Sequence, residues 1–95
     1  MKRRIALKLA RELESGKWKK GKDTLGRGEC VRCCLGVLQE IAPKSLPKQP
    51  LSHGYPSKDV SMWAGLSENE TKDLAYLNDA TRGWTQVTKK LRETP

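Results

Sequence analysis

A short apolar stretch that begins with cysteines most limits how this chain can fold. It runs CVRCCLGVL from Cys30 to Leu38 and directly follows a lysine-rich segment that contains several glycines. We predict a helix over residues 30–42, because apolar side chains recur at helical spacing and Pro43 would end it. The face shared by these side chains carries Cys34, Val37, Leu38 and Ile41. The first residues, near 29–33, could instead form a short β element, so both structures remain open there.

The cysteines allow either a metal or redox site or a packed core element. Cys30 and Cys33 have the spacing of half a zinc site, which needs a second pair of ligands. Cys34 and His53 are the only other Cys or His residues, and adjacent cysteines point in different directions on a regular element. Redox chemistry would require a thioredoxin-like βαβ context, of which there is no sign. We therefore expect no metal, and Cys34 to be a small buried hydrophobe, with Gly36 allowing another element to approach closely.

The length and composition indicate one domain, 1–95, in a reducing compartment. The chain has 95 residues, is 36% hydrophobic and has no Phe, so three Trp and the aliphatic residues must supply most of the core. A homo-oligomer would help so small a domain. Three cysteines, two of them adjacent, make a disulfide framework improbable. With no apolar run of about 18 residues, we expect a cytoplasmic protein that does not enter the membrane.

The remaining pattern predicts a mostly α fold of about four helices. Residues 2–15 alternate apolar and charged side chains as an amphipathic helix does, and Gly16 is a natural end for it. Residues 17–28 contain three glycines and are predicted to form a loop. Residues 43–56 contain four of the five prolines, which indicates a long, structured, partly extended loop.

Helix-capping signals divide the C-terminal part. The segment over 57–65 starts at Ser57, a candidate N-cap, and stops at Gly65. Ser67 forms a capping-box pattern with Glu70, and the helix that follows is predicted to exit at residues 78–79. Thr85 is predicted to cap an amphipathic last helix.

The basic charge is concentrated in the first half of the chain. Residues 1–50 contain 13 Lys and Arg but 5 Asp and Glu, whereas residues 51–95 contain 6 of each. Such asymmetry is typical of proteins with an anionic partner, although it also serves solubility alone.

The basic glycine-containing segment is the strongest candidate for a ligand site. Backbone amides and cationic side chains of such a loop can surround a phosphate. The candidate phosphate-binding residues are Lys19, Lys20, Lys22, Arg27 and Arg32. Trp18 could stack on a base, or it could fold back as a core anchor for the first helix. Asn78 and Asp79 could read the polar edges of a base or ribose.

A catalytic set is not evident. His53 is the only histidine and lies in the proline-rich loop, where a lone histidine is usually solvated. Gly21-Lys22-Asp23-Thr24 lacks the preceding glycine and strand of a P-loop. We therefore predict a protein that is not an enzyme and that uses no cofactor.

Several short segments resemble a family of small uncharacterised proteins of tailed phages and prophages. The matching segments are LESGKWKKGK from Leu13, CCLGVL from Cys33, WAGL from Trp63 and LND from Leu77, followed by an amphipathic last helix. The chain departs from that family in having Trp84 where Phe is usual, and in a shorter proline-rich segment before Trp63. The resemblance implies an accessory protein that acts in the host cytoplasm. Small phage accessory proteins often counter host immunity by sequestering cyclic nucleotide signals or by masking defence complexes.

Together these features favour a non-enzymatic binding protein, with counter-defence as its setting, that sequesters a phosphorylated nucleotide-type signal. The anionic partner would then be a small molecule held at a site between subunits of a homo-oligomer. One alternative is a basic inhibitor that docks on an acidic host protein. Direct binding of nucleic acid is the other.

Overall fold

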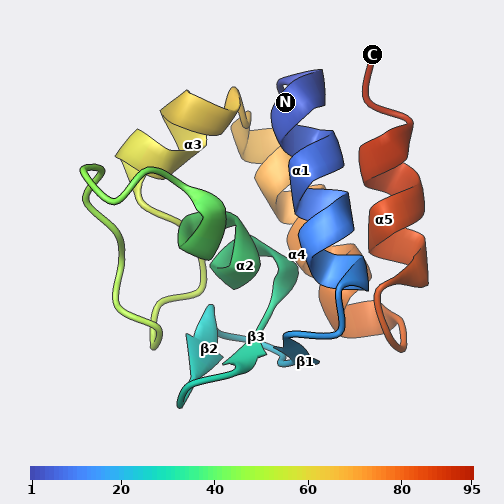
Figure 1. Ribbon diagram of the computed structural model, residues 1–95, viewed down its shortest axis with the longest axis horizontal. Coiled ribbons are helices and arrows are strands. Elements are labelled where there is room, and N and C mark those ends of the chain that lie inside the picture. Colours follow the sequence, from blue (N-terminus) through green and yellow to red (C-terminus); the bar gives the residue numbers. More distant parts are fainter.

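Five α-helices and a small three-stranded sheet make up the chain (Figure 1). The computed structural model describes residues 1–95. The helices are α1 (Arg3–Glu14), α2 (Cys34–Ile41), α3 (Lys58–Ala64), α4 (Glu68–Ala80) and α5 (Thr85–Arg92). The strands are β1 (Lys19–Lys20), β2 (Gly26–Arg27) and β3 (Val31–Arg32), in the spatial order β1-β3-β2. The fold is mostly α, as expected, with five helices where about four were predicted.

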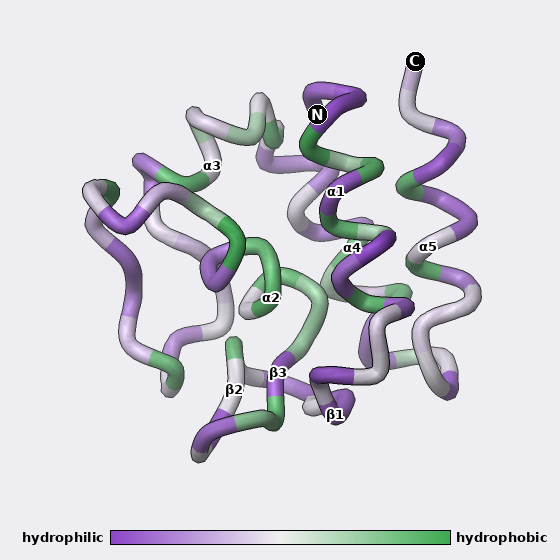
Figure 2. Tube along the Cα trace, viewed as in Figure 1, coloured by the Kyte–Doolittle hydropathy of each residue, from purple (hydrophilic) through white to green (hydrophobic).

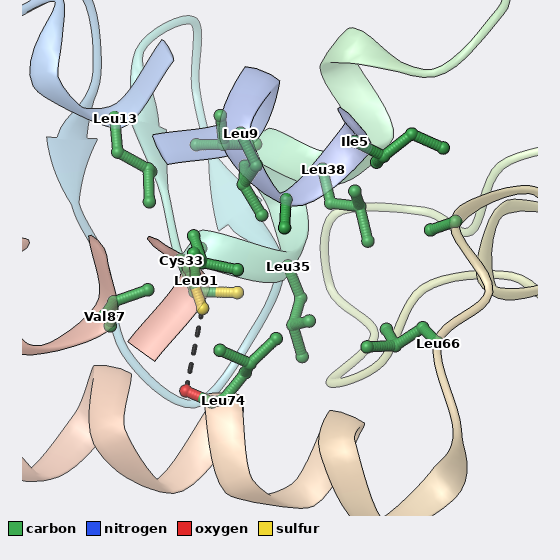
Figure 3. Packing of buried hydrophobic residues seen from close by; sticks show 14 of the residues in the cluster. Ile5, Leu9, Leu13, Cys33, Leu35, Leu38, Leu66, Leu74, Val87 and Leu91 are labelled. Atoms are coloured by element: carbon green, nitrogen blue, oxygen red, sulfur yellow. Dashed lines mark hydrogen bonds between the residues drawn. The ribbon is translucent and has the colours of Figure 1, made fainter. Parts of the chain in front are cut away.

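Helix α2 lies at the centre of the core. Its residues from Cys34 to Gln39 are all buried, as is typical of a helix that is apolar on every side. Figure 2 shows this helix as hydrophobic along most of its length. Figure 3 shows Leu35 and Leu38 among side chains from other helices, including Leu9 of α1 and Leu74 of α4. The cysteine stretch is therefore a core element from Cys33 to Leu38, whereas Cys30 is exposed. The helix predicted over 30–42 begins only at Cys34, and the alternative of a short β element near 29–33 is present as β3.

Gly36 explains how the segment before α2 reaches the core. A Cβ atom at this position would lie 1.9 Å from the Leu25 carbonyl oxygen, closer than any side chain permits. That same oxygen accepts a hydrogen bond of 3.0 Å from the Cys33 backbone amide. The close approach expected at Gly36 is present, and Leu25 is the residue that makes it.

Helices α1 and α5 lie side by side (Figure 1). Each buries one face, with Leu9 and Leu13 from α1 and Val87 and Leu91 from α5. The prediction that Thr85 caps α5 is wrong. Trp84 occupies the N-cap position without a side-chain hydrogen bond, and Thr85 is the first helical residue.

Local capping sets the start of α3 and α4. Ser57 Oγ accepts a hydrogen bond from the Val60 amide at 3.2 Å, and Gly65 ends α3 with a φ of 64°. Ser67 and Glu70 form the predicted capping box at 3.1 and 3.0 Å. The predicted exit at residues 78–79 is wrong, because α4 continues to Ala80.

Polar side chains hold the proline-rich loop in place. Gln39 Oε1 of α2 accepts hydrogen bonds of 3.0 Å from the amides of Gln49 and Ser57. Ser57 Oγ in turn donates to the Pro47 carbonyl oxygen at 2.6 Å. The loop therefore packs on the helical core.

None of the five helices has the length and apolar character needed to cross a lipid bilayer.

Candidate anion-binding site

The basic segment is shaped by the small sheet. β1 pairs in parallel with β3, where Lys19 lies opposite Val31 and Lys20 opposite Arg32. β2 completes the sheet as the antiparallel neighbour of β3, so residues 17–28 contain two short strands and are not wholly the predicted loop. Because side chains alternate along a strand, Lys19 is exposed and Lys20 is partly buried. The short strands thus separate two adjacent lysines onto different faces.

A tight turn follows β1 and is centred on Asp23. The Thr24 amide donates to the Lys22 carbonyl oxygen at 2.8 Å, and Asp23 has a φ of 69°, which defines a γ-turn. Such a turn is uncommon for a residue other than glycine, and strained backbone of this kind clusters at ligand sites. The turn directs the chain around a hollow on the surface.

This hollow has a volume of about 580 Å³ and is strongly basic. It is lined by Lys20, Gly21, Lys22, Asp23, Thr24, Gly26, Arg27 and Val31. Lys22 and Arg27 are exposed and make no ion pair, so their charges are available to an anion. Three of the five predicted phosphate-binding residues therefore meet at one place. Lys19 lies beside it on β1 without lining it.

Lys20 is held at the inner edge of the hollow. Its Nζ atom donates to the Thr81 carbonyl oxygen just beyond the end of α4. Burial, and next the positive charge of Lys22, lower the pKa of Lys20 below its ordinary value. A bound anion would oppose the effect of Lys22 by adding a negative charge nearby, so Lys20 gains from a negatively charged ligand.

A second hollow of about 260 Å³ adjoins the first. The two share Asp23 and Thr24. The remaining walls are Cys33, Gly54, Tyr55, Ala75, Asn78 and Asp79. Tyr55 is half exposed and belongs to the proline-rich loop, which had given no sign of a ligand site. The loop reaches this position because the amides of Leu25 and Gly26 donate to the carbonyl oxygens of His53 and Leu51, at 2.7 and 3.1 Å.

Asn78 has a structural role in place of the predicted contact with a base or ribose. It is completely buried in α4, where Oδ1 accepts from the Cys34 amide at 2.9 Å. Its Nδ2 donates to the Gly21 carbonyl oxygen at 2.8 Å and to Asp79 Oδ1 at 3.0 Å. Since the polar atoms of its side chain are engaged, Asn78 clamps the basic loop to α2. Asp79 stays at the wall of the second hollow, where Oδ1 also accepts from the Asp23 amide at 3.5 Å.

Arg32 does not join the other predicted phosphate-binding residues. It is only 6% exposed, and its Nε donates to Glu40 Oε2 at 2.9 Å. Its Nη1 donates to the carbonyl oxygens of Gly28 and Val31 at 3.0 and 2.7 Å. The Glu40 carboxylate neutralises the guanidinium charge, and the hydrogen bonds to the two carbonyl oxygens hold the β2–β3 hairpin closed.

Trp18 is a core anchor, the alternative to stacking on a ligand. The residue is 9% exposed, and its indole Nε1 donates to Glu12 Oε2 of α1 at 2.8 Å. Lys17 Nζ and Arg32 Cζ lie 5.0 and 5.1 Å from the ring centroid, within reach of cation–π attraction. The ring face is thus already occupied by the protein's own cations.

The three cysteines are free thiols with different surroundings. Cys30 is exposed, whereas Cys33 Sγ accepts from the Gly36 amide at 3.4 Å as the N-cap of α2. Cys34 Sγ donates to the Leu74 carbonyl oxygen at 3.6 Å, the dashed line in Figure 3. Burial raises the pKa of Cys33 and of Cys34, which keeps both as neutral thiols. No three Cys, His, Asp or Glu side chains gather as metal ligands.

Comparison with known proteins yields no match. No family model, no curated protein and no solved structure matches the chain.

Proposed function

We propose that this chain is a non-enzymatic binding protein that sequesters a phosphorylated nucleotide-type ligand. The observation that carries the proposal is the pair of adjoining hollows around the turn at Asp23. One hollow is lined by three cations and the other by an aromatic ring and polar groups. Together they reach the size of small-molecule sites, about 300–1,000 Å³.

The charges suggest how such a ligand would lie. Its phosphates would occupy the larger hollow, where Lys22 and Arg27 are exposed and Lys20 supplies a third cation. Its base or ribose would extend past Thr24 into the smaller hollow, against Tyr55 and Asp79. An aromatic ring that is half exposed can stack on a base, which contributes about 1–3 kcal/mol.

The chemistry of nearby groups supports binding without turnover. The buried thiols of Cys33 and Cys34 have raised pKa values, so neither is an activated nucleophile. His53 is exposed, and it is its backbone that contacts the basic loop. The carboxylates that line the hollows, Asp23 and Asp79, make no hydrogen bond to the Thr24 hydroxyl or the Cys33 thiol, so no nucleophile is paired with a general base there.

The proposal extends to a setting in host cytoplasm. The resemblance to phage accessory proteins supports a counter-defence role, in which an immune nucleotide signal is trapped before it reaches its receptor. Trapping depends on affinity and on protein concentration. A homo-oligomer that places the hollows near a subunit interface would enclose the ligand further.

Thermal unfolding with a panel of linear and cyclic nucleotides, at moderate salt, tests this function. A ligand present at 100 times its Kd stabilises by about 2.7 kcal/mol, which raises the Tm by on the order of 10 °C for a domain of this size. Mass spectrometry of small molecules released from protein purified out of infected cells would identify the natural ligand.

Paired variants make the test specific to the hollow. The double variant Lys22→Ala/Arg27→Ala removes both exposed cations and should abolish the shift. The control Lys44→Ala/Lys58→Ala removes two exposed lysines that line neither hollow, and should preserve it. If no nucleotide raises the Tm, the proposal fails, and docking on an acidic host protein becomes the better explanation.

A further inference from the structure

The exposed face of α1 carries a line of cations. Arg4, Lys8 and Arg11 are spaced by four and three residues, so they lie on one side of the helix within about 60° of each other. All three are exposed, and the buried side chains of Leu9 and Leu13 lie on the opposite side. They extend over about 10 Å of the helix axis. The line is therefore a feature of the surface and not of the core.

These cations have no partner within the protein. None of the three side chains takes part in a hydrogen bond or an ion pair, whereas Arg3 Nη1 at the edge of α1 donates to the Thr94 carbonyl oxygen at 2.7 Å. The two carboxylates of α1 are engaged elsewhere. Glu12 accepts from Trp18, and Glu14 pairs with Arg92 of α5. No negative charge on this helix is left to neutralise the line.

The same face lacks the anchors of a protein interface. Hot spots of protein–protein contact are usually aromatic or large apolar side chains in a desolvated centre. The large hydrophobic side chains that are exposed are Tyr55, Met62 and Tyr76, which lie on α3, α4 and the loop before them. A line of flexible cations without an apolar centre suits a row of phosphates, of which each strand of a duplex carries one per about 3.4 Å of helix axis.

We infer that the exposed face of α1 binds the phosphodiester backbone of nucleic acid, without reading its sequence. The binding is electrostatic, because each cation replaces a counterion on a phosphate. This surface is separate from the hollows, since Arg4, Lys8 and Arg11 line neither of them. The protein would thus have two anion sites, a recessed one for a small molecule and a flat one for a polymer.

Fluorescence anisotropy with a labelled 20-base-pair DNA duplex, over a series of salt concentrations, tests the inference. The triple variant Arg4→Ala/Lys8→Ala/Arg11→Ala should bind at least tenfold more weakly at low salt. The slope of log Kobs against log salt should fall by about 2.7, because each neutralised phosphate contributes about 0.9. Alanine is the best helix former, so the Tm should change little.

A matched control separates the α1 face from net charge. The variant Lys44→Ala/Lys58→Ala/Lys72→Ala loses the same number of positive charges from exposed positions outside α1 and should retain the slope. Equal losses in both variants would overturn the inference in favour of a general charge effect. Binding of polyglutamate as tightly as the duplex would overturn it in favour of an acidic protein partner. Loss of duplex binding in Lys22→Ala/Arg27→Ala, with the α1 variant unaffected, would place the DNA in the hollow instead.

Discussion

Helix α2 and the basic segment from Lys19 to Arg27 pack against each other, but different forces hold them. α2 buries Cys34 to Gln39 in succession, so the hydrophobic effect fixes its position. In the basic segment the strands are two residues long and only Leu25 enters the hydrophobic core, so backbone hydrogen bonds to other segments set most of its path. The core is thus defined by its own sequence, whereas the candidate site takes its shape from distant residues.

The point where the two regions touch should be the most sensitive to change. Gly36→Ala would place a methyl group 1.9 Å from the Leu25 carbonyl oxygen, and backbone atoms on both sides would have to move. We expect a loss of about 3 kcal/mol or more, measured by urea unfolding.

Gly54→Ala is the control for that substitution. Its nearest neighbour, the Asp23 carbonyl oxygen, would lie at 3.6 Å, an ordinary contact. We expect a change within about 0.5 kcal/mol. Similar stabilities for the two variants would show that the regions do not meet as closely as described.

Asn78→Ala removes the side chain that joins the two regions. The variant leaves the Cys34 amide and the Gly21 carbonyl oxygen without their partner, which should cost about 2 kcal/mol or more. Urea unfolding measures the loss, and Asn69→Ala on the exposed side of the same helix should change stability by less than about 0.5 kcal/mol. Equal effects would mean that the clamp is not structural.

Arg32 and Arg27 test the difference between an engaged and an available cation. Arg32→Lys loses the fork that binds Glu40 and two carbonyl oxygens, and should destabilise by about 1–2 kcal/mol. Arg27→Lys keeps an exposed charge and should be neutral within about 0.5 kcal/mol. A neutral Arg32→Lys would contradict the assignment of Arg32 to the fold.

Alkaline pH should weaken the core by a smaller amount. The pKa of Cys34 is raised by burial, so the neutral thiol is favoured in the folded state. The stabilisation that comes from burying the neutral thiol is complete below the unfolded pKa of 9.0. It is lost as the pH rises from there through the folded pKa, because the thiol ionises first in the unfolded state. Between pH 8 and pH 10 the free energy of unfolding should fall by about 1 kcal/mol on this account. Cys34→Ala should reduce the measured loss to the part that the buried Cys33 thiol contributes, whereas Cys30→Ala, at an exposed thiol, should leave it unchanged. The same pH slope in both variants would contradict this assignment.

The features that could be predicted from the sequence are those that depend on residues close together along the chain. The amphipathic pattern of α1 and the capping box at Ser67 depend on residues within four positions, and both were found in the sequence. Lys22 and Arg27 meet in one hollow because a short glycine-containing loop keeps them near each other. These features needed only local information.

The errors arose where tertiary contacts override local preference. The pair Asn78-Asp79 is typical of a turn, but Asn78 lies within α4, where its side chain accepts a hydrogen bond from the Cys34 amide. In the sequence Arg32 cannot be told apart from the other cations, because its partner Glu40 comes beside it only in the folded chain. Tyr55 reaches the second hollow because the backbone of the proline-rich loop pairs with Leu25 and Gly26. No pattern of side chains in the sequence predicts such backbone pairing. Contacts of this kind join segments far apart in the sequence.

The hydrogen bond from the Cys33 amide to the Leu25 carbonyl oxygen has a practical consequence. An amide exchanges with solvent only when its bond opens, so protection at Cys33 measures how often the basic loop detaches from α2. A ligand bound in the larger hollow would hold the basic loop against α2 and so slow the exchange of the Cys33 amide. This would happen even though Cys33 does not contact the phosphates of the ligand. One amide in the core thus reports on the surface loop, and it can be followed by hydrogen–deuterium exchange before any ligand is known.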